Sequence, residues 1–83
     1  MNRRRLDEAL ALLDRGDWQA AHVIVQEEES APFSAWAHGI VHIIEGDLSN
    51  ARYWYDRAKR GFPAQPSASE ELRALRQALT DAG

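Results

Sequence analysis

The sequence has no cysteine among its 83 residues. This absence excludes disulfide bonds, thiolate metal ligands and cysteine nucleophiles. A long apolar run is also absent, because the most apolar stretch, residues 35–44, is interrupted by His38 and His42 and is far shorter than the roughly 20 residues of a transmembrane helix. Acidic residues occupy the N-terminal segment where a signal peptide would have its apolar core. We therefore expect a cytoplasmic protein with no membrane segment.

The chain also lacks an excess of positive charge, with 10 Lys and Arg against 13 Asp and Glu and a net charge of −3. Nucleic-acid binding needs a basic face that neutralises phosphates, so it is not expected. The 45% hydrophobic and 28% charged residues are typical of a folded domain. No Gly-rich phosphate loop, Ser-His-Asp pattern or HExxH motif is present. We expect no catalytic site.

Five segments have the apolar spacing of amphipathic helices, which predicts an all-α fold. They cover residues 5–15, 17–29, 33–45, 48–60 and 67–83. Gly16 and Gly46 are predicted to end the preceding helices, and Asp17 and Asp47 to cap the following ones. Ser34 is expected to cap the third helix. Met1 to Arg4 are expected to be frayed or engaged elsewhere, because arginines are unfavourable at a helix start.

We expect a single domain over residues 1–83. Its parts are a first helical hairpin over 1–30, a second over 33–61, a linker over 62–66 and a capping helix over 67–83. Ser67 and Glu70 form a capping box at the start of the last helix. A narrow apolar stripe on that helix comprises Leu72, Leu75, Leu79 and Ala82. The stripe is expected to cover the four preceding helices, and a homodimer through this helix is the alternative.

The turn Gly16-Asp17 recurs thirty residues later as Gly46-Asp47, which indicates two copies of one helical hairpin. The second copy resembles a tetratricopeptide repeat (TPR). Residues that match TPR positions are Gly39, Ala51, Tyr55, Ala58 and Pro63. The Trp, Leu and Tyr positions of the repeat hold Ala35, His38 and His42 instead. The resemblance implies two antiparallel TPR-like helix-turn-helix pairs, a C-terminal capping helix and a function in binding a protein or peptide partner.

A longer run over residues 36–58 reads WxHxxxHxxEGDxxNAxYWYxxA. It resembles an uncharacterised family of small bacterial proteins. That resemblance implies a bacterial origin and covers most of the chain before Pro63. It implies no particular activity.

The three histidines are the candidate functional residues. His38, His42 and Glu45 share one face of the third predicted helix, and His22 on the helix before could join them. Imidazoles and a carboxylate are ligands for a zinc-type ion, so these four residues are metal candidates. A buried hydrogen-bond network and a peptide or small-ligand pocket are the alternatives, and neither needs a cofactor. The residues predicted to bind are His22, Gln26, His38, His42, Glu45, Asn50, Tyr53 and Trp54.

Overall fold

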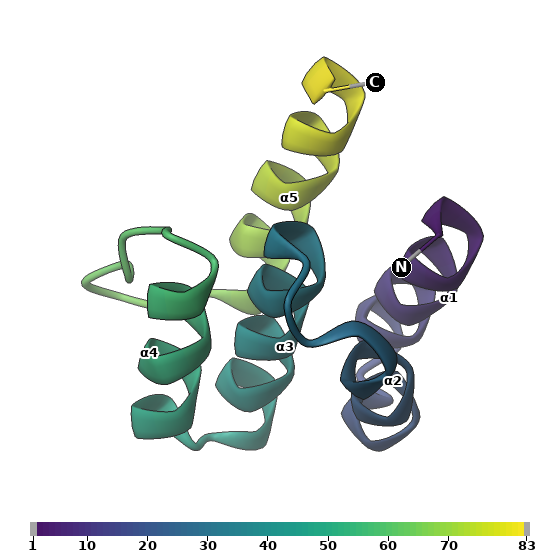
Figure 1. Cartoon of the computed structure of the whole chain (residues 1–83). Coiled ribbons are helices and arrows are strands. Elements are labelled where there is room, and N and C mark those ends of the chain that lie inside the picture. Colours follow the sequence, from purple (N-terminus) through teal and green to yellow (C-terminus); the bar gives the residue numbers. More distant parts are fainter. Residues whose placement is uncertain (1, 83) are drawn as a thin grey trace.

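The computed structural model describes residues 2–82, which form five α-helices, one short 3-10 helix and no β-strand. The elements are α1 (Arg3–Asp14), α2 (Trp18–Val25), the 3-10 helix η1 (Gln26–Glu28), α3 (Pro32–Glu45), α4 (Leu48–Arg57) and α5 (Ala68–Ala82). The prediction of an all-α fold with five helices is confirmed (Figure 1). Within these residues, no helix is both long and apolar enough to cross a membrane.

The helices form two hairpins with a fifth helix laid across them. α1 packs against α2 and α3 against α4, while α2 also packs against α3, so that α3 lies in the middle of the array (Figure 1). α5 packs mainly on α3 and reaches α1. As a result α3 is covered on both of its faces, and every residue from Ser34 to His42 is buried.

The two inter-helix turns have the same local geometry, as the repeated Gly-Asp pair predicted. Gly16 and Gly46 have positive φ values of 77° and 92°, which glycine adopts without steric cost. The carboxylate of Asp17 then accepts a hydrogen bond from the Ala20 N–H, and that of Asp47 accepts one from the Asn50 N–H, each at 3.3 Å. Local sequence therefore determines where α1 and α3 end and where α2 and α4 begin.

The apolar stripe of α5 is used within its own chain. Leu72, Leu75 and Leu79 are buried in the core, whereas Ala82, predicted on the same stripe, is exposed. The capping role is therefore observed, and a homodimer through α5 would have to use another face of that helix. On α4, the first residue, Leu48, is 43% exposed.

The first four residues were predicted to be frayed or engaged elsewhere, but Arg3 and Arg4 lie in the first turn of α1. The side chain of Asn2 caps this helix by accepting a hydrogen bond from the Arg5 N–H at 2.9 Å. Arg3 also pairs with Asp7 one turn later, at 3.1 Å. Met1 lies outside the described residues.

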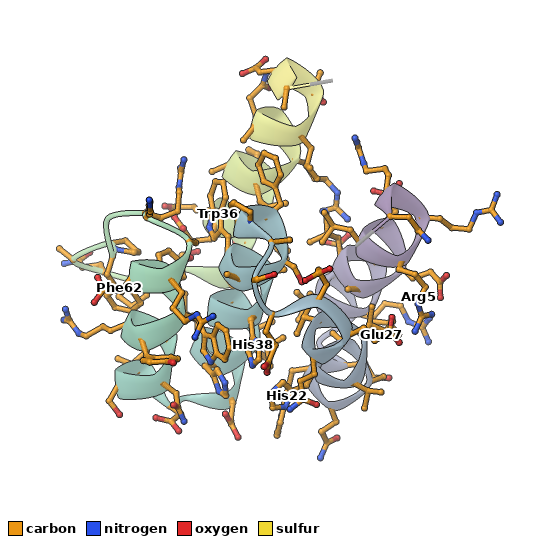
Figure 2. All side chains as sticks on the ribbon, in the orientation of Figure 1. Arg5, His22, Glu27, Trp36, His38 and Phe62 are labelled. Atoms are coloured by element: carbon orange, nitrogen blue, oxygen red, sulfur yellow. The ribbon has the colours of Figure 1, made fainter. Side chains whose placement is uncertain are left out.

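The second predicted helix is shorter than expected, since α2 ends at Val25 and the chain continues as η1. Arg5 of α1 contacts Glu27 of η1 through two hydrogen bonds, with 3.0 Å between Arg5 Nε and Glu27 Oε1 (Figure 2). This ion pair is exposed, and water screens such pairs so that they contribute little to stability. It nevertheless fixes the acidic end of the first hairpin against α1.

Two further helix ends differ from the predictions. Ser34 does not cap α3, which begins at Pro32; its buried hydroxyl donates a hydrogen bond to the Val25 carbonyl at 3.2 Å. α4 ends at Arg57 rather than Arg60, because Lys59 adopts a left-handed conformation with φ 59° that no α-helix can continue.

Candidate functional site

All three histidines of the chain converge between α2 and α3. His22 comes from α2 and His38 from α3 (Figure 2). His42 lies one turn after His38 on α3. The Nε2 atoms of His22 and His38 are 3.0 Å apart. The ring centroids of the three histidines lie 4.8 to 5.2 Å from one another. The helical spacing of His38 and His42 was visible in the sequence, but only the packing of α2 on α3 adds His22.

Glu45 contacts the ring of His42 in this histidine cluster. Its Oε1 atom lies 2.7 Å from His42 Nδ1. A carboxylate only accepts hydrogen bonds, so Nδ1 of His42 donates its proton to Glu45, and Nε2 is the nitrogen that carries the lone pair in the neutral form of this tautomer. Glu45 thus selects one tautomer of a buried histidine. Carboxylates that orient metal-ligating histidines act in the same way.

His38 is the most enclosed of the three histidines, with 2% of its surface exposed. The indole of Trp54 stacks on its ring, with centroids 3.8 Å apart and planes 10° from parallel. The guanidinium of Arg57 lies 5.2 Å from the centre of the Trp54 ring. Among the described residues, no atom makes a hydrogen bond with the buried Nδ1 of His38. The cluster is therefore an incompletely satisfied polar group inside the fold.

The pKa of His38 is lowered to about 3, mainly by burial and in smaller part by the nearby His22 and His42, because a second positive charge would be repelled. Burial also lowers the pKa of His22, with a smaller contribution from His42, while Glu45 and Glu29 act in the opposite direction. At neutral pH His38 is uncharged and therefore has a free lone pair.

The other predicted binding residues lie at or outside the edge of this cluster. Gln26 is exposed at the end of α2. Asn50 is exposed and donates its side-chain hydrogen bond to Asp47 at 2.8 Å. Tyr53 is 51% exposed, and its ring meets that of Trp54 edge to face at 5.2 Å. Of the eight predicted residues, the structure joins His22, His38, His42, Glu45 and Trp54.

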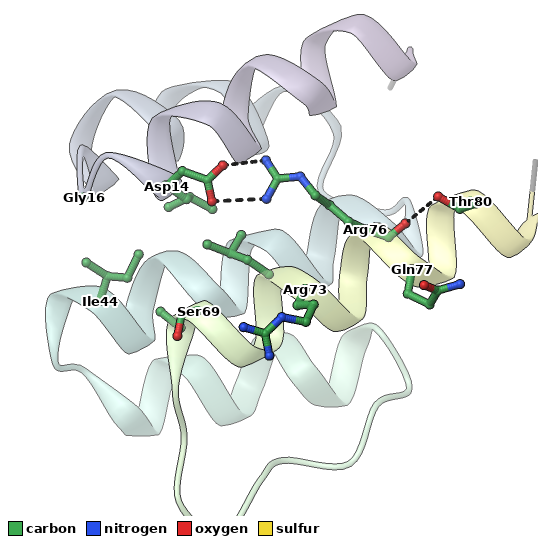
Figure 3. Close-up of a pocket in the computed structure, with 11 residues that line it drawn as sticks. Asp14, Gly16, Ile44, Ser69, Arg73, Arg76, Gln77 and Thr80 are labelled. Carbon is green, nitrogen blue, oxygen red and sulfur yellow. Dashed lines mark hydrogen bonds and ion pairs between the residues drawn. The ribbon is translucent and has the colours of Figure 1, made fainter.

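An open cavity of about 700 Å³ lies elsewhere, between the C-terminal end of α1, the end of α3 and the length of α5 (Figure 3). Its apolar lining includes Leu13, Ile44 and Leu72. At its rim the guanidinium of Arg76 makes two hydrogen bonds with the Asp14 carboxylate, at 2.8 and 3.1 Å. None of the eight residues predicted to bind a ligand lines this cavity.

A second polar group, which was not predicted from the sequence, is centred on Glu71 of α5. Glu71 Oε1 accepts hydrogen bonds from the Tyr55 hydroxyl at 2.5 Å and from the Trp36 indole N–H at 3.2 Å. The guanidinium of Arg60 covers the Trp36 ring at 3.7 Å. The available signal was that a buried Trp and Tyr each need a partner for their polar atom.

Comparison of the chain with protein-family models, with curated proteins and with solved structures finds no match. Its function must therefore be inferred from its own residues and geometry. Two features can carry such an inference: the histidine cluster between α2 and α3, and the open cavity bounded by α1, α3 and α5.

Proposed function

We propose that the protein is a small TPR-like interaction module that binds a peptide segment of a partner protein in the cavity between α1, α3 and α5. The cytoplasmic location and the bacterial origin expected from the sequence are part of this proposal. The repeated hairpin supports the TPR-like assignment. Both hairpins turn at a glycine of positive φ and both continue from an aspartate that caps the next helix.

The observation that carries the proposal is which helices line the cavity. Apart from Gly16 in the first turn, all of its lining residues belong to α1, α3 and α5. These are the first, third and fifth helices, so they occupy equivalent places in successive pairs. Proteins built from stacked helical pairs use such a surface, formed by equivalent helices, to bind extended partners.

The chemistry of the cavity indicates the kind of segment that would fit. Leu13, Ile44 and Leu72 offer an apolar surface for one anchoring side chain. Arg73 stands exposed at the cavity, and no ion pair in residues 2–82 involves it, whereas Arg76 is already paired with Asp14. We therefore expect a peptide with one large apolar residue and a nearby acidic residue, since affinity comes from apolar anchors and register from a few polar contacts.

A random peptide library screened against the full chain tests this proposal. Enriched peptides should combine an apolar and an acidic residue, and they should shift the backbone amide NMR signals of Ile44, Leu72 and Arg73. Arg73→Glu should weaken the binding of these peptides about tenfold or more, because a charge-assisted hydrogen bond becomes a repulsion.

Arg4→Glu is the matched control. Arg4 is also an exposed helical arginine without an ion pair among the described residues, but it lies at the opposite end of α1 from the cavity. This variant should bind the selected peptides like the wild type. Equal loss in both variants, signal shifts confined to α2 and α4, or no enriched peptide would each contradict the proposal.

A further inference from the structure

The histidine cluster has no part in the proposed peptide cavity. His38 and His42 lie on one side of α3. Ile44, which lines the cavity, is turned by about 120° from His38 and about 160° from His42, because α-helical residues are spaced about 100° apart. No residue of the cluster lines the cavity. The two features can therefore be argued and tested separately.

We propose that His22, His38 and His42 form the binding site of one divalent metal ion of the zinc class, with Glu45 orienting His42. The three histidines each offer a ring nitrogen, and these donor atoms all lie within 4.8 Å of one another. The site joins two helices of different hairpins. A bound ion would therefore clamp α2 to α3.

The distances between the nitrogens suit a tetrahedral ion. A zinc ion about 2.0 to 2.1 Å from each nitrogen holds two ligands about 3.3 Å apart. The Nε2 atoms of His22 and His38 are 3.0 Å apart, already near this separation. The two nitrogens that are farthest apart are at most 4.8 Å from each other. They must therefore approach by about 1.5 Å to bind one ion, and a small rotation of the imidazole rings supplies this movement.

Hydrogen bonding alone accounts poorly for this arrangement. Two Nε2 atoms that face each other share a single proton, so only one of the two rings can donate to the other. The other nitrogen of His38 is buried without a partner among residues 2–82. A buried network retained only for structure would be expected to satisfy its members. Imidazoles that bind a metal instead present unprotonated nitrogens to one point.

The surroundings of the cluster also fit a metal site. Glu45 contacts the Nδ1 of His42 at 2.7 Å, which leaves Nε2 as the atom that His42 can offer. A carboxylate on the far nitrogen of a ligating histidine is the usual orienting contact in zinc sites. His38 and His42 are buried, while His22 is only half-buried and leaves a side open for entry of the ion. Three protein ligands leave one tetrahedral position for water or another small ligand.

A second set of ligands, His42, Glu45 and Asp47, also lies within reach of a common point. It is the weaker candidate because Asp47 is already engaged at the start of α4. Its carboxylate accepts hydrogen bonds from the N–H and the side chain of Asn50, at 3.3 and 2.8 Å. The two sets have only His42 as a common ligand, and Glu45 orients His42 in the first set but would itself be a ligand in the second. His22 and Asp47 are therefore the residues whose substitution distinguishes them.

Zinc titration of the full chain, purified without an affinity tag and freed of metal with a chelator, tests the proposal. Calorimetry and competition with a chromophoric chelator should show one zinc ion per chain. The melting temperature should rise with zinc concentration, because an ion that binds only the folded state stabilises it. The imidazole nitrogen NMR signals of all three histidines should shift. Absence of stoichiometric binding by the wild type would overturn the proposal.

Three variants locate the ion, each with its fold checked by circular dichroism. Glu45→Gln should weaken zinc binding about 10- to 100-fold, because it removes the orienting carboxylate. His22→Gln should weaken it by more, since it removes a ligand, and its half-buried position makes the change tolerable for folding. Asp47→Asn keeps the helix cap and should bind zinc like the wild type. Loss of binding in Asp47→Asn, or wild-type affinity in His22→Gln, would refute the three-histidine site.

Discussion

Gly39 of α3 lies directly against the ring of Tyr55 of α4. A Cβ atom at position 39 would be 2.4 Å from Tyr55 Cδ1 and 3.3 Å from the Ala51 carbonyl oxygen. Tyr55 is 1% exposed, and its hydroxyl is held by Glu71, so the ring has no room to withdraw. The close approach of α3 and α4 therefore depends on the absence of a side chain at this position.

Gly39→Ala is expected to lower the free energy of unfolding by about 1 to 3 kcal/mol, as overpacking of a filled core does. Helix propensity alone favours alanine by about 1 kcal/mol, so the sign of the effect tests the contact. Urea denaturation of the variant and of Gly61→Ala provides the measurement. Gly61 has open space around its Cβ position, and its substitution should be nearly neutral.

Glu71 is expected to stabilise the fold far more than its neighbour Glu70. Glu71→Ala leaves the hydroxyl of Tyr55 and the indole N–H of Trp36 without their acceptor, which should cost about 2 kcal/mol or more. Glu70 is exposed in the same helical turn, so Glu70→Ala controls for the loss of a negative charge near the helix start. Thermal denaturation compares the two variants. Similar melting temperatures would show that the Glu71 contacts contribute little.

Replacing Lys59 with glycine should increase the stability of the protein. It occupies the left-handed position after α4, where Arg60 N–H bonds to the Tyr55 carbonyl at 2.9 Å. The same position holds Gly16 after α1 and Gly46 after α3. A left-handed residue with a Cβ costs about 1 to 2 kcal/mol, so Lys59→Gly should stabilise the protein by up to about 1 kcal/mol.

Gly46→Ala is the reciprocal change and should destabilise the protein by about 1 kcal/mol or more. Open space surrounds the Cβ position of Gly46, so backbone strain alone would cause this loss. Chemical denaturation of both variants measures the pair. Effects of the same sign at positions 46 and 59 would be inconsistent with this explanation.

The metal-free protein should lose stability as the pH falls below about 6.5. Burial lowers the pKa of His38 to about 3 in the folded state, so the unfolded chain binds a proton that the folded chain does not. Stability is therefore greatest above pH 6.5 and declines toward pH 3, by up to about 1.4 kcal/mol per pH unit from this group. His22, whose pKa burial also lowers, adds to the decline.

Melting temperatures measured with a chelator between pH 8 and pH 5 test this dependence. His38→Gln should reduce the slope of melting temperature against pH, even if the variant is less stable at every pH. A melting temperature that does not change between pH 8 and 5 would show that the histidines are not buried in their neutral form.

Helix boundaries were predicted best where their cause is local. Asp17 and Asp47 cap the helices that they precede, and Gly16 and Gly46 end the helices before them, because these contacts join residues three to five positions apart. Lys59 escaped prediction, since a lysine carries no signal for a left-handed conformation. Arg3 was predicted to lie before the first helix because positive charge is unfavourable at a helix start. In the structure the Asn2 cap outweighs this effect, and Arg3 begins α1.

The candidate site was only half visible in the sequence. The spacing of His38, His42 and Glu45 on one helix predicted their common face, and the structure bears out the contact between His42 and Glu45. The Nε2 contact between His22 and His38 depends instead on how α2 packs against α3. Gln26 and Asn50 were candidates by sequence proximity alone, and the packing of the helices leaves both exposed.

By itself, the sequence determined five amphipathic helices, their order, the two glycine turns and the lack of any cysteine chemistry. These properties follow from apolar periodicity and from capping contacts within one or two helical turns. Only the tertiary structure decided that Glu71 would join Trp36 and Tyr55, that Arg76 would pair with Asp14 and that His22 would meet His38. Those partners are 16 to 62 residues apart, so their meeting depends on how whole helix faces pack rather than on local sequence.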